Sequence, residues 1–212
     1  MVVIVEYHKY VFDTDKREFV DFFEEMYQNE QVDNFDSWRQ EDSRKLQRKI
    51  ALSILEEYNF QSIVDVGSGK GALTHLLKKR NNQVIGLDIS PTAVEQAKAR
   101  FPDIQFSSID VNDSDKFELF LKDFLKSHVG GGSLIFTAEC LSYLSNWKDF
   151  IQVASRNIDY LMVSLFIPKD PIGFVKTAKE LELEICKHYE IIESVYLAKS
   201  GFIVIFGKSH AI

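Results

Sequence analysis

Residues 63–71 constrain the fold of this chain more than any other stretch. An apolar run ends at Asp65, glycines follow at alternate positions (Gly67, Gly69 and Gly71), and a helical pattern begins at once. This order predicts a strand, a tight turn and a helix N-terminus, because glycine allows a sharp turn and a close ligand approach. The first N–H groups of the helix are free to bind that ligand. We therefore expect a nucleotide-like cofactor here, with an ordinary glycine-rich turn as the alternative.

Two cofactors fit the glycines. Gly67-x-Gly69-x-x-Ala72 satisfies the looser dinucleotide fingerprint, whereas Asp65-x-Gly67-x-Gly69-x-Gly71 resembles motif I of the class I S-adenosylmethionine (SAM) methyltransferases. Charge separates them, because an acid at the turn repels a pyrophosphate but favours the ammonium and sulfonium of SAM. The resemblance implies SAM as cofactor and S-adenosylhomocysteine as product. An NAD-dependent oxidoreductase is the alternative.

The next two predicted strands also end in acids. The run 83–89 reaches Asp88 about 20 residues past the glycines, where a carboxylate holds ribose hydroxyls. The run 104–110 ends in Asp110, which by the resemblance contacts the adenine amino group, while the Val111 backbone contacts the ring. The cofactor residues expected in these segments are Asp65, Gly67, Ser68, Gly69, Gly71, Asp88, Ile89, Asp110 and Val111.

Alternating strands and helices predict an α/β fold, with a parallel sheet and helices on both faces. Strands are expected at 61–66, 83–88, 104–109, 133–138 and 159–167, followed by a hairpin at 191–199 and 202–208 that is split at Ser200-Gly201. A C-terminal hairpin after five such strands resembles the Rossmann-like, seven-stranded sheet of class I methyltransferases. The strand order of that sheet is 3-2-1-4-5-7-6, with the last hairpin antiparallel.

Two helices are predicted before this sheet, at residues 14–29 and 36–58, from the spacing of their apolar residues. We expect one domain over 1–212, with an N-terminal helical cap (1–58) and a Rossmann-like core (59–212). The first 35 residues are hypothesised to form a lid that shapes the acceptor pocket, although their aromatic side chains could equally belong to the core.

Charge and composition limit the partners. A net charge of −7 and a pI near 5.3 disfavour a nucleic acid, because phosphate contacts need a basic surface. No apolar run approaches the length of a membrane span, and residues 1–9 lack the pattern of a signal peptide. Cys140 and Cys186 are not at metal-ligand spacing, so we expect reduced thiols, no metal and a cytoplasmic monomer or homodimer.

The segment upstream of motif I narrows the resemblance. Trp38-Arg-Gln-Glu41 and Gln47-Arg48-Lys49 are similar to the N-terminal helix of the nodulation protein S family. These enzymes N-methylate the terminal amino sugar of chitooligosaccharides. There a Trp and an Arg cover the cofactor, and the Arg reaches its carboxylate; the matching residues here are Trp38 and Arg48. A guanidinium suits that contact, but a packing Trp and a solvated Arg are the alternatives.

The segment 137–144 supplies the catalytic candidates. It resembles that family's Glu-x-Leu-x-Tyr segment, at the sheet edge where ligands of open α/β folds bind. Glu139 is expected beside the cofactor's methyl group, where it accepts the proton of a substrate ammonium or fixes the substrate by a hydrogen bond. A partly dry site would raise its pKa. Tyr143 is expected to orient an amine or hydroxyl, or else to pack beside the site.

The same segment separates this chain from the small-RNA 2′-O-methyltransferases, which place a Glu and His cluster there to bind a metal. Here Ser142-Tyr143 and Ser145-Asn146 occupy the corresponding positions. The expected activity is methyl transfer from SAM to a small-molecule acceptor, with N-methylation slightly favoured over O-methylation. A non-catalytic SAM-binding protein is a further alternative. The chitooligosaccharide is not carried over, because motif I and residues 1–35 differ from that family.

Overall fold

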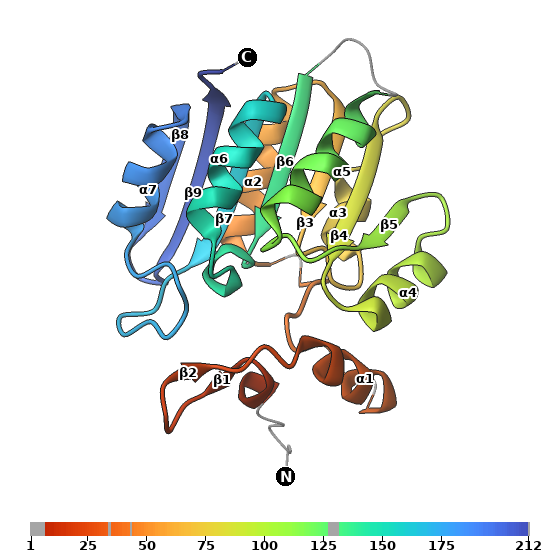
Figure 1. Cartoon of the computed structure of the whole chain (residues 1–212), viewed down its shortest axis with the longest axis vertical. Coiled ribbons are helices and arrows are strands. Elements are labelled where there is room, and N and C mark those ends of the chain that lie inside the picture. Colours follow the sequence, from red (N-terminus) through yellow and green to blue (C-terminus); the bar gives the residue numbers. More distant parts are fainter. Residues whose placement is uncertain (1–6, 34, 43, 127–131, 212) are drawn as a thin grey trace.

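A seven-stranded sheet forms the centre of the molecule. The N-terminal elements form a cap that lies at the carboxyl ends of the parallel strands (Figure 1). The computed structural model describes residues 7–33, 35–42, 44–126 and 132–211. The strand order is β5-β4-β3-β6-β7-β9-β8, in which β9 is antiparallel to both neighbours and the other pairs are parallel. The expected order is thereby confirmed. The strands are β3 (Phe60–Val66), β4 (Gln83–Asp88), β5 (Gln105–Ser108), β6 (Gly132–Ala138), β7 (Tyr160–Phe166), β8 (Tyr189–Leu197) and β9 (Phe202–Ser209).

Helices cover both faces of the sheet. Ile63 packs in the cluster under α2 (Leu46–Glu56) and α3 (Ala72–Leu77). Its neighbour Val64 packs in the larger cluster under α5 (Ser114–Lys126), α6 (Trp147–Asn157) and α7 (Ala178–Cys186). Successive strand residues point to opposite faces, so a strand buried on both faces reads as a continuous apolar run. Such runs made the strands visible in the sequence.

Ser90-Pro91 in the sequence predicts a helix start, with Ser as N-cap and Pro at the first helical position, and helix α4 (Pro91–Arg100) begins there. Its N-cap Ser90 accepts a hydrogen bond from the Ala93 amide through Oγ at 3.1 Å, and Pro91 occupies the first helical position. The proline presets the helical φ at a position whose N–H would have no intrahelical partner. Because α4 follows β4 directly, the N-cap at Ser90 also fixes where the chain leaves the sheet after Asp88.

The cap differs from the predicted pair of helices. It consists of a 3-10 turn (Tyr7–Tyr10), a short hairpin of β1 (Phe12–Asp13) and β2 (Glu18–Phe19), and α1 (Phe23–Asp33). The prediction of a helix from Thr14 is wrong, because the Asp13 carboxylate accepts hydrogen bonds from the next turn. Arg17 then adopts a left-handed backbone, with φ +56°. Side-chain bonds of this kind compete with helix formation.

The predicted helix 36–58 also starts later, at α2. The Asp36 carboxylate accepts hydrogen bonds from the amides of Trp38 (3.2 Å) and Gln40 (2.6 Å), and Arg39 has φ +47°. Asp36 thus closes an isolated turn. Helix α2 packs on the sheet and belongs to its helical layer, although the sequence analysis grouped it with the cap.

Two sequence predictions concern parts of the chain that are only partly described. The glycines at 130–132 predict a flexible turn, and they lie outside the described residues except for Gly132, which begins β6. The lid hypothesis covers residues 1–35, of which 1–6 and 34 are outside. Within the described residues, no helix is long and apolar enough to cross a membrane.

Candidate functional site

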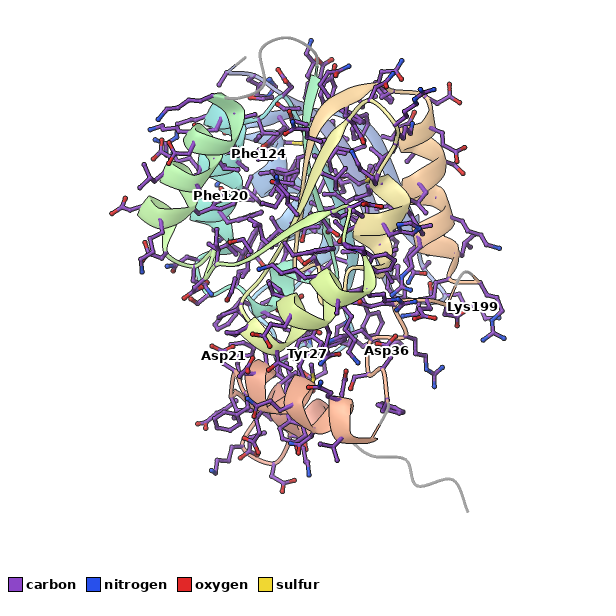
Figure 2. All side chains as sticks on the ribbon, turned by 90° about the vertical axis from the view of Figure 1, so that its right-hand side faces the viewer. Asp21, Tyr27, Asp36, Phe120, Phe124 and Lys199 are labelled. Carbon is purple, nitrogen blue, oxygen red and sulfur yellow. The ribbon has the colours of Figure 1, made fainter. Side chains whose placement is uncertain are left out.

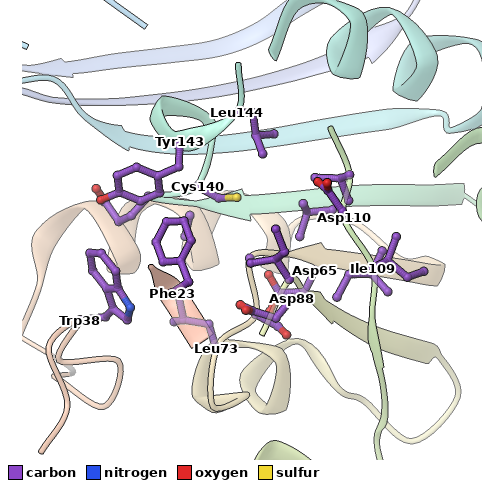
Figure 3. A pocket seen from close by; sticks show the side chains of 18 of the residues that line it. Phe23, Trp38, Asp65, Leu73, Asp88, Ile109, Asp110, Cys140, Tyr143 and Leu144 are labelled. Carbon is purple, nitrogen blue, oxygen red and sulfur yellow. The ribbon is translucent and has the colours of Figure 1, made fainter. Parts of the chain in front are cut away.

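A pocket lies between the cap and the carboxyl ends of β3, β4 and β6, where parallel α/β sheets bind ligands (Figures 1 and 3). Most of the residues predicted for the site meet there. Its wall includes Trp38, Arg48, Asp65, Gly67, Ser68, Asp88, Ile89, Asp110, Val111, Glu139 and Tyr143. Gly69 and Gly71 are not part of the wall and shape the loop behind it.

The glycine loop turns through three left-handed residues. The φ angles are +76° at Gly67, +52° at Gly69 and +80° at Gly71, a region that other residues rarely adopt. A Cβ at Gly67 would lie 2.7 Å from Cβ of Cys140, and one at Gly69 would overlap the Gln40 side chain. The sequence analysis assigned the missing Cβ atoms to ligand approach, whereas here protein atoms fill that space.

Two buried carboxyl groups flank the loop. Asp88 accepts hydrogen bonds from the amides of Gly69 (2.8 Å) and Ser90 (3.0 Å), while Asp65 accepts one from Thr74 Oγ1 at 2.6 Å. Burial raises the pKa of Asp65 to about 7 and that of Asp88 to about 6. A cationic or hydrogen-donating ligand beside them would favour their ionised forms.

Glu139 follows β6 in a strained conformation. Its φ is +62°, and its amide donates to the Ser164 carbonyl at 2.8 Å. Its Oε2 accepts a hydrogen bond from the Phe166 amide at 3.0 Å. Burial raises the pKa of Glu139 to about 7, although Phe166 N–H, Lys45 and Arg48 oppose the shift. The direction agrees with the sequence-based expectation, and strain held by two strands is typical of functional positions.

Arg48 binds the turn at residues 38–40, below α1, through three hydrogen bonds. Its Nη1 donates to the carbonyls of Arg39 (2.7 Å) and Gln40 (2.8 Å), and its Nη2 donates to that of Trp38 (3.3 Å). Three of the five guanidinium N–H groups are used in these bonds, which leaves Nε–H and one N–H of Nη2 for a ligand. The structure brings Trp38 and Arg48 to the same wall, as the resemblance implies.

Three buried polar atoms of the wall have no hydrogen-bond partner among the described residues. They are Nε of Arg48, Oγ of Ser68 and Oε1 of Glu139. Buried polar atoms are nearly always paired, so unpaired ones concentrated in a single pocket indicate that a ligand completes them. All three belong to residues that the sequence singles out.

The pocket is acidic. Among the described residues, its wall carries five carboxyl groups and a single Lys or Arg side chain, that of Arg48. The carboxyl groups are those of Asp21, Asp65, Asp88, Asp110 and Glu139. Such a wall attracts a cation and repels a pyrophosphate.

An aromatic wall faces the acids. Figure 3 shows Phe23, Trp38 and Tyr143 gathered on the side away from Asp110. The Tyr143 ring lies 5.5 Å from that of Phe23 and 5.7 Å from that of Trp38. Burial raises the pKa of Tyr143. Tyr143 both lines the pocket and packs with the cap, and its role in orienting an amine or hydroxyl stays a prediction.

The sequence analysis missed two polar residues of this wall, Asp21 and Gln40, whereas Tyr27 belongs to the segment hypothesised to shape the acceptor pocket. Figure 2 shows Asp21 and Tyr27 where the cap meets the core. Asp21 has φ +58°, and burial together with the nearby Asp110 raises its pKa. No local motif marks these positions, because their neighbours in space are far away in the sequence.

Comparison with known proteins identifies the domain. Residues 64–159 match the family described as a methyltransferase domain, and the sheet has the order of that class. Residues 64–159 therefore carry a methyltransferase domain, and the chain has the fold of the class I SAM-dependent methyltransferases. SAM is the cofactor of this class, which confirms the expectation from motif I.

Two of the known structures that share this fold show how far the likeness extends. A SAM-dependent methyltransferase from Anabaena variabilis is 14% identical, with a TM-score of 0.68 over 88% of this chain and 93% of the other. The N-methyltransferase NodS from Bradyrhizobium japonicum, in complex with S-adenosylhomocysteine, is 17% identical, with a TM-score of 0.64 over 87% of this chain and 98% of the other. At these identities the likeness shows the fold.

Two of the curated relatives are ribosomal RNA methyltransferases. The ribosomal RNA small subunit methyltransferase A of Mycoplasma mycoides is 28% identical over 137 residues, which are 65% of this chain and 46% of the relative. The chain spans less than half the length of the first curated relatives that it matches. Within the described residues, no group of three His, Cys, Asp or Glu side chains could hold a metal ion.

The pocket fits SAM. Its acidic wall suits an ammonium and a sulfonium, while Arg48 Nε and Ser68 Oγ are unpaired donors of the kind a carboxylate needs. Apolar side chains of Ile89, Ile109 and Val111 lie next to Asp110, where an adenine would stack.

Proposed function

We propose that this methyltransferase transfers a methyl group from SAM to the nitrogen of a small amine. The observation that carries the proposal is the unpaired Oε1 of Glu139, buried in an acidic pocket beside the glycine loop. A carboxylate in that position needs a hydrogen-bond donor, and an amine or ammonium supplies one. O-methylation of a hydroxyl is the second candidate, since a hydroxyl also donates.

The proposed cofactor contacts are assigned to residues that line the pocket. Asp88 accepts hydrogen bonds from the ribose hydroxyls, while Asp110 and the Val111 backbone hold the adenine. Arg48 Nε and Ser68 Oγ bind the carboxylate, and Asp65 attracts the ammonium. Gly67, Gly69 and Gly71 shape the loop, Ile89 packs on the adenosine, and Trp38 covers the cofactor. Glu139 completes the site next to the transferred methyl group.

SAM brings a methyl group that is already activated on a sulfonium, so the protein mainly orients the acceptor and removes its proton. Glu139 would accept that proton in its ionised form, which leaves a neutral amine with a free lone pair. The rings of Phe23 and Tyr143 would wall the acceptor and limit its size. Methylated amines also bind favourably against aromatic faces.

Charge favours a small amine over RNA. An RNA acceptor would bring phosphates towards a wall with five carboxyl groups on a chain of net charge −7. The cap also covers the carboxyl edge of the sheet, where a duplex or loop would have to approach (Figure 1). These features support a partner without phosphate groups and no nucleic acid.

Calorimetry tests the cofactor. We expect S-adenosylhomocysteine to bind wild type and the exposed-site control Asp103→Ala equally, NAD not to bind, and Asp88→Ala to lose about tenfold or more in affinity, as expected for a lost charged hydrogen bond. Binding of NAD, or full affinity in Asp88→Ala, would contradict the cofactor site.

Turnover with small amines tests Glu139. The rate should rise as the pH passes about 7, because Glu139 must be ionised to accept a proton. Glu139→Gln should lower the rate by about 10²-fold while S-adenosylhomocysteine still binds, and Glu193→Gln on exposed β8 should leave it unchanged. Wild-type turnover in Glu139→Gln would remove Glu139 from this role. Binding without turnover of any amine or hydroxyl would favour a non-catalytic SAM-binding protein.

A further inference from the structure

The pocket opens to solvent between Asp21 of the cap and Ile89 and Asp110 of the core. All three residues line the wall and are exposed. Asp110 follows β5, whereas Asp21 lies between β2 and α1 at the junction of the cap and the core (Figure 2). The cap and the core thus each place one carboxylate at the opening. The two are close enough that Asp110, together with partial burial, raises the pKa of Asp21.

Backbone hydrogen bonds hold Asp21 in this position. The Val20 amide donates to the Val11 carbonyl at 2.9 Å. The Phe22 amide donates to the Tyr10 carbonyl at 2.7 Å. Between these two bonds Asp21 adopts a left-handed backbone with φ +58°, which turns the chain from the hairpin into α1. A shift of Asp21 away from the opening would break one or both bonds.

Glu24 ties the same segment to the core. Its Oε2 accepts hydrogen bonds from Ser90 Oγ at 2.5 Å and from the Thr92 amide at 3.2 Å, and its Oε1 accepts one from Thr92 Oγ1 at 2.5 Å. Ser90 caps α4 two residues after Asp88, so the first turn of α1 is fixed to the end of β4. Asp21 therefore lies at the end of the pocket that is assigned to the adenosine.

Asp21 combines features that no contact within the protein offsets. No described residue donates a hydrogen bond to its carboxylate, and the charged group that acts on it is a second carboxylate. Its backbone conformation is uncommon for residues other than glycine. Such a residue in the wall of a pocket indicates a functional role. Independent evidence for a ligand comes from Ser68 and Arg48, which are 3% and 7% exposed and carry unpaired polar atoms in the same wall.

The adenine amino group suits a pair of carboxylates. It carries two N–H donors, and an ionised carboxylate only accepts hydrogen bonds. Asp110 accepts one bond from the Asn112 amide at 2.9 Å, and a carboxylate has room for several. One N–H of the amino group can therefore bond to Asp110 and the other to Asp21. A base with a carbonyl oxygen in that position would be repelled by both carboxylates.

We propose that Asp21 is a cofactor-binding residue of the cap, which recognises the adenine amino group together with Asp110. The cap thereby contributes to the choice of base, and the bound cofactor bridges the cap and the core. This inference rests on the proposed SAM site, because it adds a contact at the adenine end of that site.

Calorimetry with two ligands tests Asp21. S-adenosylhomocysteine carries the amino group, whereas S-inosylhomocysteine carries a carbonyl oxygen in its place. Asp21→Asn keeps the size of the side chain and tolerates the left-handed backbone, but its amide is a neutral acceptor. Affinity for S-adenosylhomocysteine should fall about fivefold, the difference between a charged and a neutral hydrogen bond. Affinity for S-inosylhomocysteine should not fall.

The matched control is Asp15→Asn, which removes the same charge from an exposed position in the turn between β1 and β2. It should keep both affinities of the wild type. Asp21→Gly removes both acceptor atoms without backbone strain, and it should lower the affinity for S-adenosylhomocysteine about tenfold or more. An equal loss for both ligands in the Asp21 variants would show a general effect of charge and would overturn the proposal. Unchanged discrimination between the ligands in Asp21→Gly would also overturn it.

Asp110→Asn separates this inference from the site on which it rests. Discrimination that falls in Asp110→Asn but not in the Asp21 variants would remove Asp21 alone from adenine recognition. Failure of wild type to bind S-adenosylhomocysteine, or full discrimination in Asp110→Asn, would instead refute the proposed cofactor site and this inference with it.

Discussion

The core and the cap border the same pocket, but different interactions stabilise each of them. The sheet is covered on both faces by large apolar clusters, whereas the cap has one small cluster around Met26 and Tyr27. The cap is joined to the core by aromatic packing of Phe12, Phe19 and Phe23 on Tyr143 and by two carboxylates. Glu24 accepts hydrogen bonds from Ser90 and Thr92, and Glu30 pairs with Lys70. Apolar burial stabilises the core without a ligand, while these polar contacts can open and close around one.

The largest expected effect lies in the core. Phe136 on β6 is almost completely buried, with 1% of its surface exposed. Phe136→Ala should reduce the free energy of unfolding by about 3–5 kcal/mol, through lost transfer free energy and the cavity left behind. Denaturant titration measures the loss. A change below about 1 kcal/mol would mean that the sheet does not depend on apolar packing as described.

A cap variant should separate the two regions. Glu30→Gln leaves the Lys70 ammonium, whose side chain is 15% exposed, without its counter-charge. This change should weaken cap closure by about 1.5–3 kcal/mol, as for a lost hydrogen bond to a charged group. Hydrogen exchange should then speed up in α1 and stay slow in β3 and β6. Equal acceleration in all three elements would show that the cap and the core unfold as one unit.

Asp65 is a core residue that also lines the pocket, and its ionised form destabilises the ligand-free protein. Its folded pKa of about 7 lies above the ordinary value of an Asp. The native state therefore binds more protons than the unfolded state at intermediate pH, and stability falls as pH rises through about 4 to 7. Asp65→Asn should raise the unfolding free energy of the ligand-free protein above pH 7 by about 1–3 kcal/mol.

Thermal unfolding at pH 4 and pH 8, with and without S-adenosylhomocysteine, measures this effect of Asp65. The variant should gain stability at pH 8 only and should bind the ligand more weakly. A stability gain that is the same at both pH values would not come from ionisation of Asp65.

The smallest effect is expected at the outer side of the cap. Arg17 in the hairpin turn pairs with Asp170 at 2.7 Å, but both side chains are about half exposed or more. Such pairs contribute about 0–1 kcal/mol. Arg17→Ala should therefore leave the melting temperature and ligand binding nearly unchanged. A large loss in either would mean that the cap depends on this exposed contact.

The same contrast explains what the sequence predicted. The order of the strands and the start of α4 at Ser90-Pro91 followed from apolar runs and capping residues, which act within one element. The cap prediction was wrong at Asp13 and Asp36, whose side chains bind nearby amides and end a helical pattern.

The site residues also fall into two groups, those that a local sequence signal marks and those that no such signal marks. Motif I and the acids after β4 and β5 are local signals, so Asp65, Asp88 and Asp110 could be placed from the sequence alone. Gln40 bonds to the backbone of Ser68 and Lys70, which are 28 and 30 residues away. This contact depends on how the cap packs, and a polar residue in an irregular turn carries no pattern that predicts it.

Glu139 has a consequence for anyone who wishes to improve this protein. Its φ of +62° is a conformation in which a side chain is disfavoured by roughly 1–2 kcal/mol relative to glycine. Selection for heat resistance alone would therefore favour Glu139→Gly, and the selected variants would lack the proton acceptor proposed for the reaction. Libraries built on this scaffold should keep codon 139 fixed or select for activity in every round.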